Sequence, residues 1–236
     1  MKACLIIHGY TGGPYEVAPL ADFLQEQTNW HIEVPTLPGH GDKLALENVT
    51  HEKWIEAAEE RVKELEAQYD EVFLIGFSMG GMIAAYLAAT YNIAKLVLLA
   101  PAGKYLAFKQ IGRDIGDVLI DGVKGELEHN EIYLNYKRKM GEVPFKANLE
   151  FLKLVRFTRK YLNKVKSPVL IAQGQQDNMV PYKTPYYFDR HITSERKEVV
   201  LFERSRHCIC LGEDKDTLNN ITYSFLIENK ETVKTE

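Results

Sequence analysis

Short apolar runs alternate along this chain with segments whose apolar positions recur at helical spacing. The apolar runs, bounded by turn residues, predict six buried strands, at Ala3–Ile7, His31–Val34, Glu71–Ile75, Lys95–Leu99, Pro168–Gln173 and Lys197–Phe202. Amphipathic patterns between them predict a turn of helix after Pro181 and longer helices at Pro14–Gln27, His51–Gln68, Met79–Tyr91 and Asp214–Glu228. Strands that are apolar throughout and alternate with helices predict a doubly wound parallel sheet with helices on both faces.

The alternation is interrupted between residues 103 and 164. About sixty residues separate two predicted strands there, where roughly 10 to 20 would complete one crossover helix. Helical patterns at Glu126–Met140 and Ala147–Asn163 predict a helical cap above the carboxyl edge of the sheet. We therefore divide the chain into a core of residues 1–102 and 165–236 and an inserted cap of residues 103–164.

Composition restricts the class of protein further. The 236 residues fit one domain, and 45% hydrophobic with 26% charged residues is typical of a globular protein. A net charge of -4 argues against nucleic acid as a partner. No apolar run approaches the roughly 20 residues that cross a bilayer, so we expect no stable membrane insertion. Three cysteines and no recognisable export signal favour the cytoplasm. The sequence leaves the oligomeric state open.

The first indication of a catalytic site is the segment Gly76-Phe77-Ser78-Met79-Gly80. It follows a predicted apolar strand and precedes a helix of small residues, which is the context that a nucleophile elbow requires. Glycines at 76 and 80 remove side chains that would collide where the chain doubles back. The sharp turn exposes the Ser78 hydroxyl, so this serine is the predicted nucleophile.

A serine nucleophile needs a general base and an acid that orients it. Asp177 lies in the turn after the fifth predicted strand, and His207 follows the last one. Both positions lie at the carboxyl edge of a parallel sheet, where Ser78 also lies. The chain order serine, aspartate, histidine is the order that accompanies a nucleophile elbow. We predict Ser78, Asp177 and His207 as a catalytic triad.

Further motifs extend the pattern over nearly the whole chain: His8-Gly9-Tyr10-Thr11-Gly12-Gly13, Leu37-Pro38-Gly39-His40-Gly41, Asp177 with Val180-Pro181, and Ser205-Arg206-His207-Cys208-Ile209. With the elbow, they give the chain a resemblance to the α/β-hydrolase superfamily. More narrowly, it resembles small bacterial carboxylesterases and monoacylglycerol-lipase-like enzymes. The resemblance implies the α/β-hydrolase fold in a reduced form with six parallel strands and a helical cap insertion.

The resemblance also implies an oxyanion hole formed by the backbone amides of Tyr10 and Met79. It favours a serine carboxylesterase that hydrolyses short- to medium-chain esters of small molecules through an acyl-enzyme, with no cofactor and no metal. Monoacylglycerol lipase and thioesterase activities are alternatives on the same triad, and a noncatalytic ligand-binding protein is a more distant one. Basic residues of the cap, such as Lys153 and Arg156, suit either a solvated helix face or contact with a membrane surface.

Overall fold

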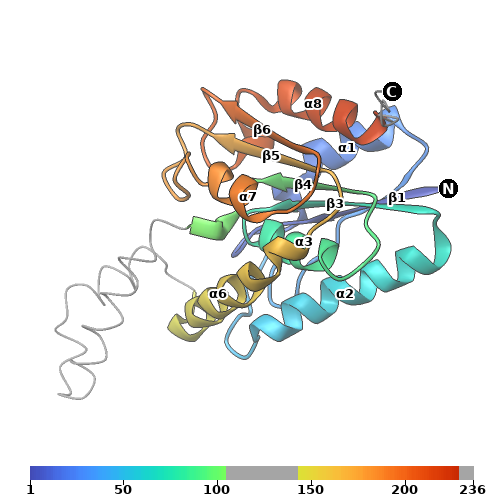
Figure 1. Cartoon of the computed structure of the whole chain (residues 1–236). Coiled ribbons are helices and arrows are strands. Elements are labelled where there is room, and N and C mark those ends of the chain that lie inside the picture. Colours follow the sequence, from blue (N-terminus) through green and yellow to red (C-terminus); the bar gives the residue numbers. More distant parts are fainter. Residues whose placement is uncertain (105–142, 229–236) are drawn as a thin grey trace, which may run out of the picture.

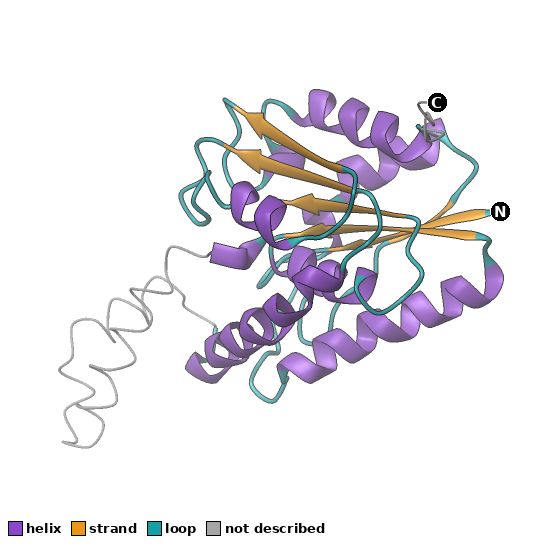
Figure 2. Cartoon of the chain, viewed as in Figure 1, coloured by secondary structure: helices purple, strands orange, loops and turns teal. Residues whose placement is uncertain are grey.

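The computed structural model describes residues 1–104 and 143–228 of the chain. A central sheet is covered by helices on both faces (Figure 1, Figure 2). The strands are β1 (Lys2–Ile7), β2 (His31–Glu33), β3 (Glu71–Phe77), β4 (Lys95–Leu99), β5 (Val169–Gly174) and β6 (Lys197–Phe202). They lie in the order β2-β1-β3-β4-β5-β6, and every pair is parallel. The predicted fold class, a six-stranded parallel sheet between helices, is confirmed.

Two helical layers bury the two faces of the sheet. One face carries α1 (Ala18–Gln27) and α8 (Lys215–Ile227), and the other carries α2 (His51–Gln68), α3 (Met79–Ala88), α6 (Phe145–Thr158) and α7 (Pro185–His191). Successive side chains of β1 alternate between these layers. Leu5 and Ile7 join the core beneath α2 and α3, whereas Cys4 and Ile6 join the core beneath α1 and α8. The strands are apolar throughout because both of their faces are buried.

One predicted helix is divided in two. The segment expected as a single helix from Pro14 to Gln27 forms a 3-10 turn, η1 (Pro14–Glu16), followed by α1. Pro19 explains the break, because a proline inside an α-helix lacks an amide hydrogen and collides with the carbonyl four residues earlier. The α-helix therefore begins immediately before Pro19, and Glu16 is left at the end of the separate turn.

Only part of the predicted cap belongs to the described structure. The helix expected at Glu126–Met140 lies outside the described residues, and the division into core and cap stays a prediction. The second cap helix is present as α6, continued by a 3-10 segment, η4 (Arg159–Lys164). Its buried side, which includes Phe151 and Leu154, packs towards α2 and α3. Its basic residues Lys153 and Arg156 are exposed.

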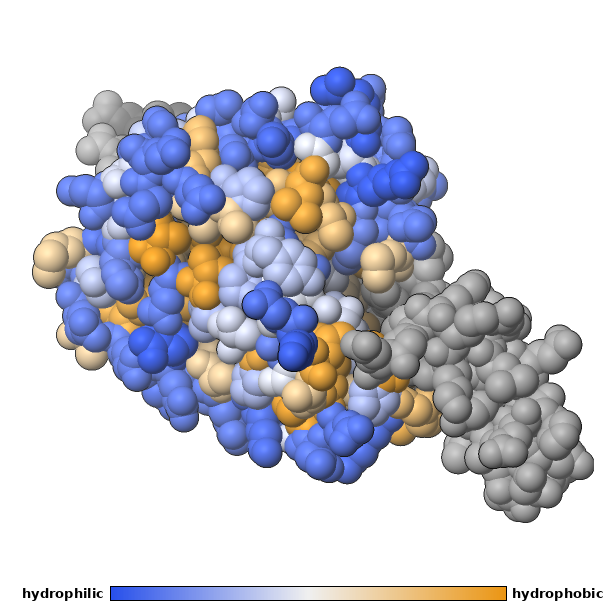
Figure 3. Space-filling model, turned by 180° about the vertical axis from the view of Figure 1, so that it is seen from behind, coloured by the Kyte–Doolittle hydropathy of each residue, from blue (hydrophilic) through white to orange (hydrophobic). Residues whose placement is uncertain are grey.

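The surface is mixed in character. The face shown in Figure 3 is largely hydrophilic, with apolar side chains gathered in separate patches. In the two described stretches of chain, no helix combines the length and the apolar character that a membrane span would need.

The strand order determines where chemistry can occur. Because all six strands are parallel, the turns that follow them lie at one edge of the sheet. The strand β3 lies between β1 and β4, so the turn after β1 is the neighbour of the turn after β3. The segments that follow β5 and β6 lie at the same edge, on the side of β3 opposite to β1.

Candidate active site

Ser78 occupies the sharp turn between β3 and α3. Its φ of 52° and ψ of -111° lie outside the usual regions for a residue with a side chain. The turn is so tight that a Cβ added at Gly76 would lie 2.3 Å from the Gly80 carbonyl oxygen, and one at Gly80 would lie 2.2 Å from the Ile7 carbonyl oxygen. These close approaches are the physical reason for glycine on either side of the serine. A strained backbone of this kind costs about 1–3 kcal/mol and persists only where its surroundings enforce it.

The His207 ring connects Ser78 to Asp177. Its Nε2 lies 2.9 Å from Ser78 Oγ, and its Nδ1 lies 2.7 Å from Asp177 Oδ2. All three residues are buried. A carboxylate can only accept, so Nδ1 carries the ring hydrogen and Nε2 is left to accept the Ser78 hydroxyl hydrogen. The geometry is that of a general base held next to a nucleophile.

Asp177 is held by hydrogen bonds to both carboxylate oxygens. The amides of Met179 and Val180 each donate to Oδ1 at 2.8 Å. The Gln173 side-chain amide donates to Oδ2 at 2.6 Å, beside the bond from His207. Gln173 was not among the predicted site residues. The sequence held one indication of its role, because Gln173 is a polar residue near the end of an otherwise apolar, buried strand.

The loop after β1 is anchored by its own histidine. The Leu37 amide donates to His8 Nε2 at 3.0 Å, so the ring hydrogen is on Nδ1, which donates to the Gly9 carbonyl at 2.8 Å. Burial lowers the pKa of His8, which keeps the ring neutral. In a trans peptide the carbonyl and the following amide point in opposite directions. Fixing the Gly9 carbonyl therefore also fixes the direction of the Tyr10 amide.

Tyr10 and Met79, the two residues predicted to form the oxyanion hole, both lie close to the Ser78 turn. Tyr10 follows β1, which pairs with β3, and Met79 is the first residue of α3, where a backbone amide has no acceptor within the helix. The adjacent strands thus bring both residues to the Ser78 turn. Their role in binding an oxyanion stays a proposal.

The Tyr10 side chain reaches the helix α6. Its ring stacks on Phe151, with centroids 4.8 Å apart and an interplanar angle of 4°, and meets the edge of Trp54 at 5.8 Å. Its hydroxyl donates to Asn148 Oδ1 at 3.2 Å. The oxyanion hole predicted from the sequence involves only the backbone amide of Tyr10. The structure adds a polar contact to α6 that the sequence did not indicate.

His40, from the motif Leu37-Pro38-Gly39-His40-Gly41, packs against the Tyr10 ring. Its centroid lies 6.0 Å from that of Tyr10 and 5.2 Å from that of His8, and its Nδ1 donates to the Pro38 carbonyl at 3.1 Å. Burial lowers the pKa of His40 to about 4, so this ring is neutral at ordinary pH. Its contacts are those of a residue that stabilises a turn.

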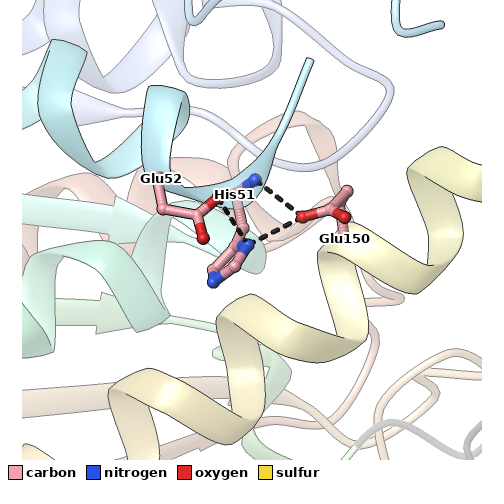
Figure 4. A group of neighbouring side chains, drawn as sticks. All are labelled: His51, Glu52 and Glu150. Atoms are coloured by element: carbon pink, nitrogen blue, oxygen red, sulfur yellow. Dashed lines mark hydrogen bonds and ion pairs between the residues drawn. The ribbon is translucent and has the colours of Figure 1, made fainter. Parts of the chain in front are cut away.

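One group in the described chain could in principle offer several ligands to a metal ion: His51, Glu52 and Glu150 (Figure 4). The Glu150 carboxylate already accepts hydrogen bonds from the His51 amide at 3.1 Å and from His51 Nδ1 at 2.7 Å. The Lys153 ammonium lies 2.7 Å from its other oxygen. With the carboxylate satisfied in this way, we assign the group a structural role, joining the start of α2 to α6.

Comparisons with known proteins agree with this geometry. Residues 1–215 match the family described as Serine aminopeptidase, S33. The chain is 26% identical over 230 residues to the thermostable monoacylglycerol lipase of Bacillus sp. (strain H-257), covering 95% of this chain and 90% of that one. It is 22% identical over 229 residues to the carboxylesterase of Bacillus subtilis (strain 168), covering 95% and 92%.

A solved structure reported for the metagenome-derived lipolytic enzymes LipS and LipT shares the fold. It superimposes with a TM-score of 0.77 at 21% identity, covering 95% of this chain and 93% of that one. The predicted resemblance to the α/β-hydrolases is therefore confirmed, both by the family match and by the fold. The chain belongs to the serine aminopeptidase S33 family of α/β-hydrolases and is a serine hydrolase.

Proposed function

We propose that this protein hydrolyses short- to medium-chain carboxylic esters through an acyl-enzyme on Ser78. The observation that carries the proposal is the buried chain of hydrogen bonds from Ser78 through His207 to Asp177, at 2.9 and 2.7 Å. In the first step Ser78 Oγ attacks the ester carbonyl while His207 Nε2 takes its proton. The same imidazolium then protonates the departing alcohol, and water cleaves the acyl-enzyme by the reverse sequence of proton transfers.

The remaining site residues stabilise charge. Attack places a negative charge on the carbonyl oxygen, and the amides of Tyr10 and Met79 are proposed to bind it. Amides already oriented before the reaction stabilise the oxyanion more than the neutral carbonyl, which lowers the barrier. Asp177 holds the His207 ring in the productive tautomer and stabilises the imidazolium.

The test is a comparison of the protein with its Ser78→Ala variant. We expect hydrolysis of p-nitrophenyl butyrate to fall by roughly 10⁶-fold, and labelling by a fluorophosphonate probe to be lost, because both need the Ser78 oxygen. Circular dichroism would verify that the variant is folded. Ester hydrolysis that persists in folded Ser78→Ala would contradict the proposal.

Monoacylglycerol lipase activity is the second candidate. It is favoured by the stacking of Tyr10, which follows β1, on Phe151 of α6 and by the similarity to the thermostable monoacylglycerol lipase. A panel of p-nitrophenyl esters of increasing acyl length and 1-monoacylglycerols separates the two activities. Acyl-CoA and aminoacyl p-nitroanilides in the same panel test thioesterase activity and the aminopeptidase activity that the family description names.

A further inference from the structure

The carboxylate of Glu16 lies against the loop that follows β1. Glu16 ends the 3-10 turn η1, and its Oε2 accepts the Gly9 amide hydrogen at 3.0 Å. The carboxylate fills the space above Gly12, where an added Cβ would lie 1.9 Å from Oε2. Glycine at position 12 is therefore what allows the carboxylate to reach the loop.

The same carboxylate also faces the loop that carries His207. Burial raises the pKa of Glu16, although the Gly9 hydrogen bond and the nearby His207 ring act to lower it. The other titratable groups near it are Tyr15, Cys208 and Cys210. Burial raises the pKa of both thiols, so they are uncharged at neutral pH. Among the described residues, Glu16 and Asp177 are thus two carboxylates near the His207 ring.

Gly9 is held at both of its polar groups. The Glu16 carboxylate binds its amide, and the His8 ring binds its carbonyl. A glycine with neither bond would rotate easily, since it has no Cβ to restrict φ and ψ. Together the two bonds fix the peptide units on either side of Gly9, including the unit that contains the Tyr10 amide.

We propose that Glu16 is a positioning residue for the ester-hydrolysis reaction. Its carboxylate holds the loop so that the Tyr10 amide points at the carbonyl oxygen above Ser78. This inference rests on the proposed function. It extends that function by one residue, which acts through the backbone of Gly9.

The first test compares Glu16→Ala with Glu26→Ala, a matched change at an exposed glutamate of α1. We expect Glu16→Ala to lower kcat for p-nitrophenyl butyrate by roughly 10- to 100-fold with KM within about threefold, because a misdirected amide weakens binding of the transition state. Glu26→Ala keeps the parent values. A kcat in folded Glu16→Ala equal to that of Glu26→Ala, or a change confined to KM, overturns the proposal.

The second test uses Glu16→Gln, whose side-chain oxygen can still accept the Gly9 amide hydrogen. We expect kcat to return to within about threefold of the parent value, because the Gly9 amide keeps its acceptor. A kcat in folded Glu16→Gln that stays roughly 10-fold or more below the parent value overturns the proposal, even if Glu16→Ala fails to fold. Activity that does not depend on Ser78 in the parent protein would instead reject the proposed function, and this inference with it.

Discussion

At the scale of single residues, the proton transfer proposed at Ser78 depends on which nitrogen of His207 carries the hydrogen. The Asp177 carboxylate decides this, because it accepts at Nδ1 and leaves Nε2 free to take the serine proton. Asp177 can perform this task only while it stays in place, and the Met179 and Val180 amides bind its second oxygen. The turn after β5 is thus built around one carboxylate.

Asp177→Asn should show how far activity depends on the tautomer of His207, because the His207 ring itself stays in the site. The asparagine amide can donate to Nδ1 and so favour the tautomer with hydrogen on Nε2, which cannot accept from Ser78. We expect kcat to fall by roughly 10⁴-fold while the fold is retained. The rate of ester hydrolysis, with Asp216→Asn on the exposed side of α8 as the control, measures the effect. A loss below about tenfold would show that Asp177 does not set the tautomer.

Ser78, Asp177 and His207 could be predicted because each follows a recognisable strand and their order fits one known arrangement. Glu16 could not be predicted in the same way. Its importance arises from a carboxylate that turns back onto Gly9, and nothing in the sequence distinguishes it from other glutamates. Gln173 carried a weak signal, as a polar residue in a buried strand, but its partner Asp177 is identified only by the folded turn.

At the scale of elements, α6 is joined to the rest of the fold by polar contacts as well as by its apolar side. Glu150, buried on α6, binds the amide and the ring of His51, where α2 begins (Figure 4). Asn148, two residues earlier in α6, accepts from Tyr10. The orientation of α6 is therefore coupled both to the start of α2 and to the loop beside the elbow.

Glu150→Gln should change stability in a pH-dependent way. Burial alone would raise the pKa of Glu150, but the hydrogen bonds from Lys153 and His51 lower it to about 2. A carboxyl whose pKa is lower in the folded state stabilises the fold above its unfolded pKa, and this stabilisation is lost as the pH falls towards 2. We expect the variant to lose about 1–3 kcal/mol of unfolding free energy at pH 7.

Urea unfolding at pH 7, 5 and 3 measures this difference. The gap between Glu150→Gln and the parent protein should be full at pH 7 and 5 and smaller at pH 3. The matched control is Glu56→Gln, an exposed position of α2 with the same substitution. A gap that is constant across the three pH values would show that the charge of Glu150 does not contribute.

The positions of the strands were predicted closely, because buried parallel strands are continuous apolar runs. The boundaries of the helices were predicted less well. Pro19 divides the expected first helix, and the second cap helix changes to 3-10 geometry at Arg159. Periodicity alone does not separate a 3-10 turn from the first or last turn of an α-helix. The boundary depends on backbone hydrogen bonds, and these form only in the folded chain.

At the scale of the whole molecule, the two edges of the sheet have different tasks. The carboxyl edge carries the strained Ser78 turn and the loops that surround it. The amino edge contains contacts that hold the layers together. Lys95, the first residue of β4, lies at that amino edge, and its ammonium donates to the carbonyls of Phe225, Leu226 and Glu228 at 2.8, 2.9 and 2.8 Å. Lys95 therefore caps the carboxyl end of α8.

Lys95→Met should therefore weaken the fold without changing the chemistry. Methionine can fill much of the same volume, but it leaves three carbonyl oxygens without their charged donor, so we expect the unfolding free energy to fall by about 2–4 kcal/mol. Lys63→Met, at an exposed position of α2, should cost far less. At a temperature where both variants remain folded, kcat/KM should match that of the parent protein. A lower kcat/KM in fully folded Lys95→Met would show that the amino edge influences the Ser78 site, and that the two tasks are not separate.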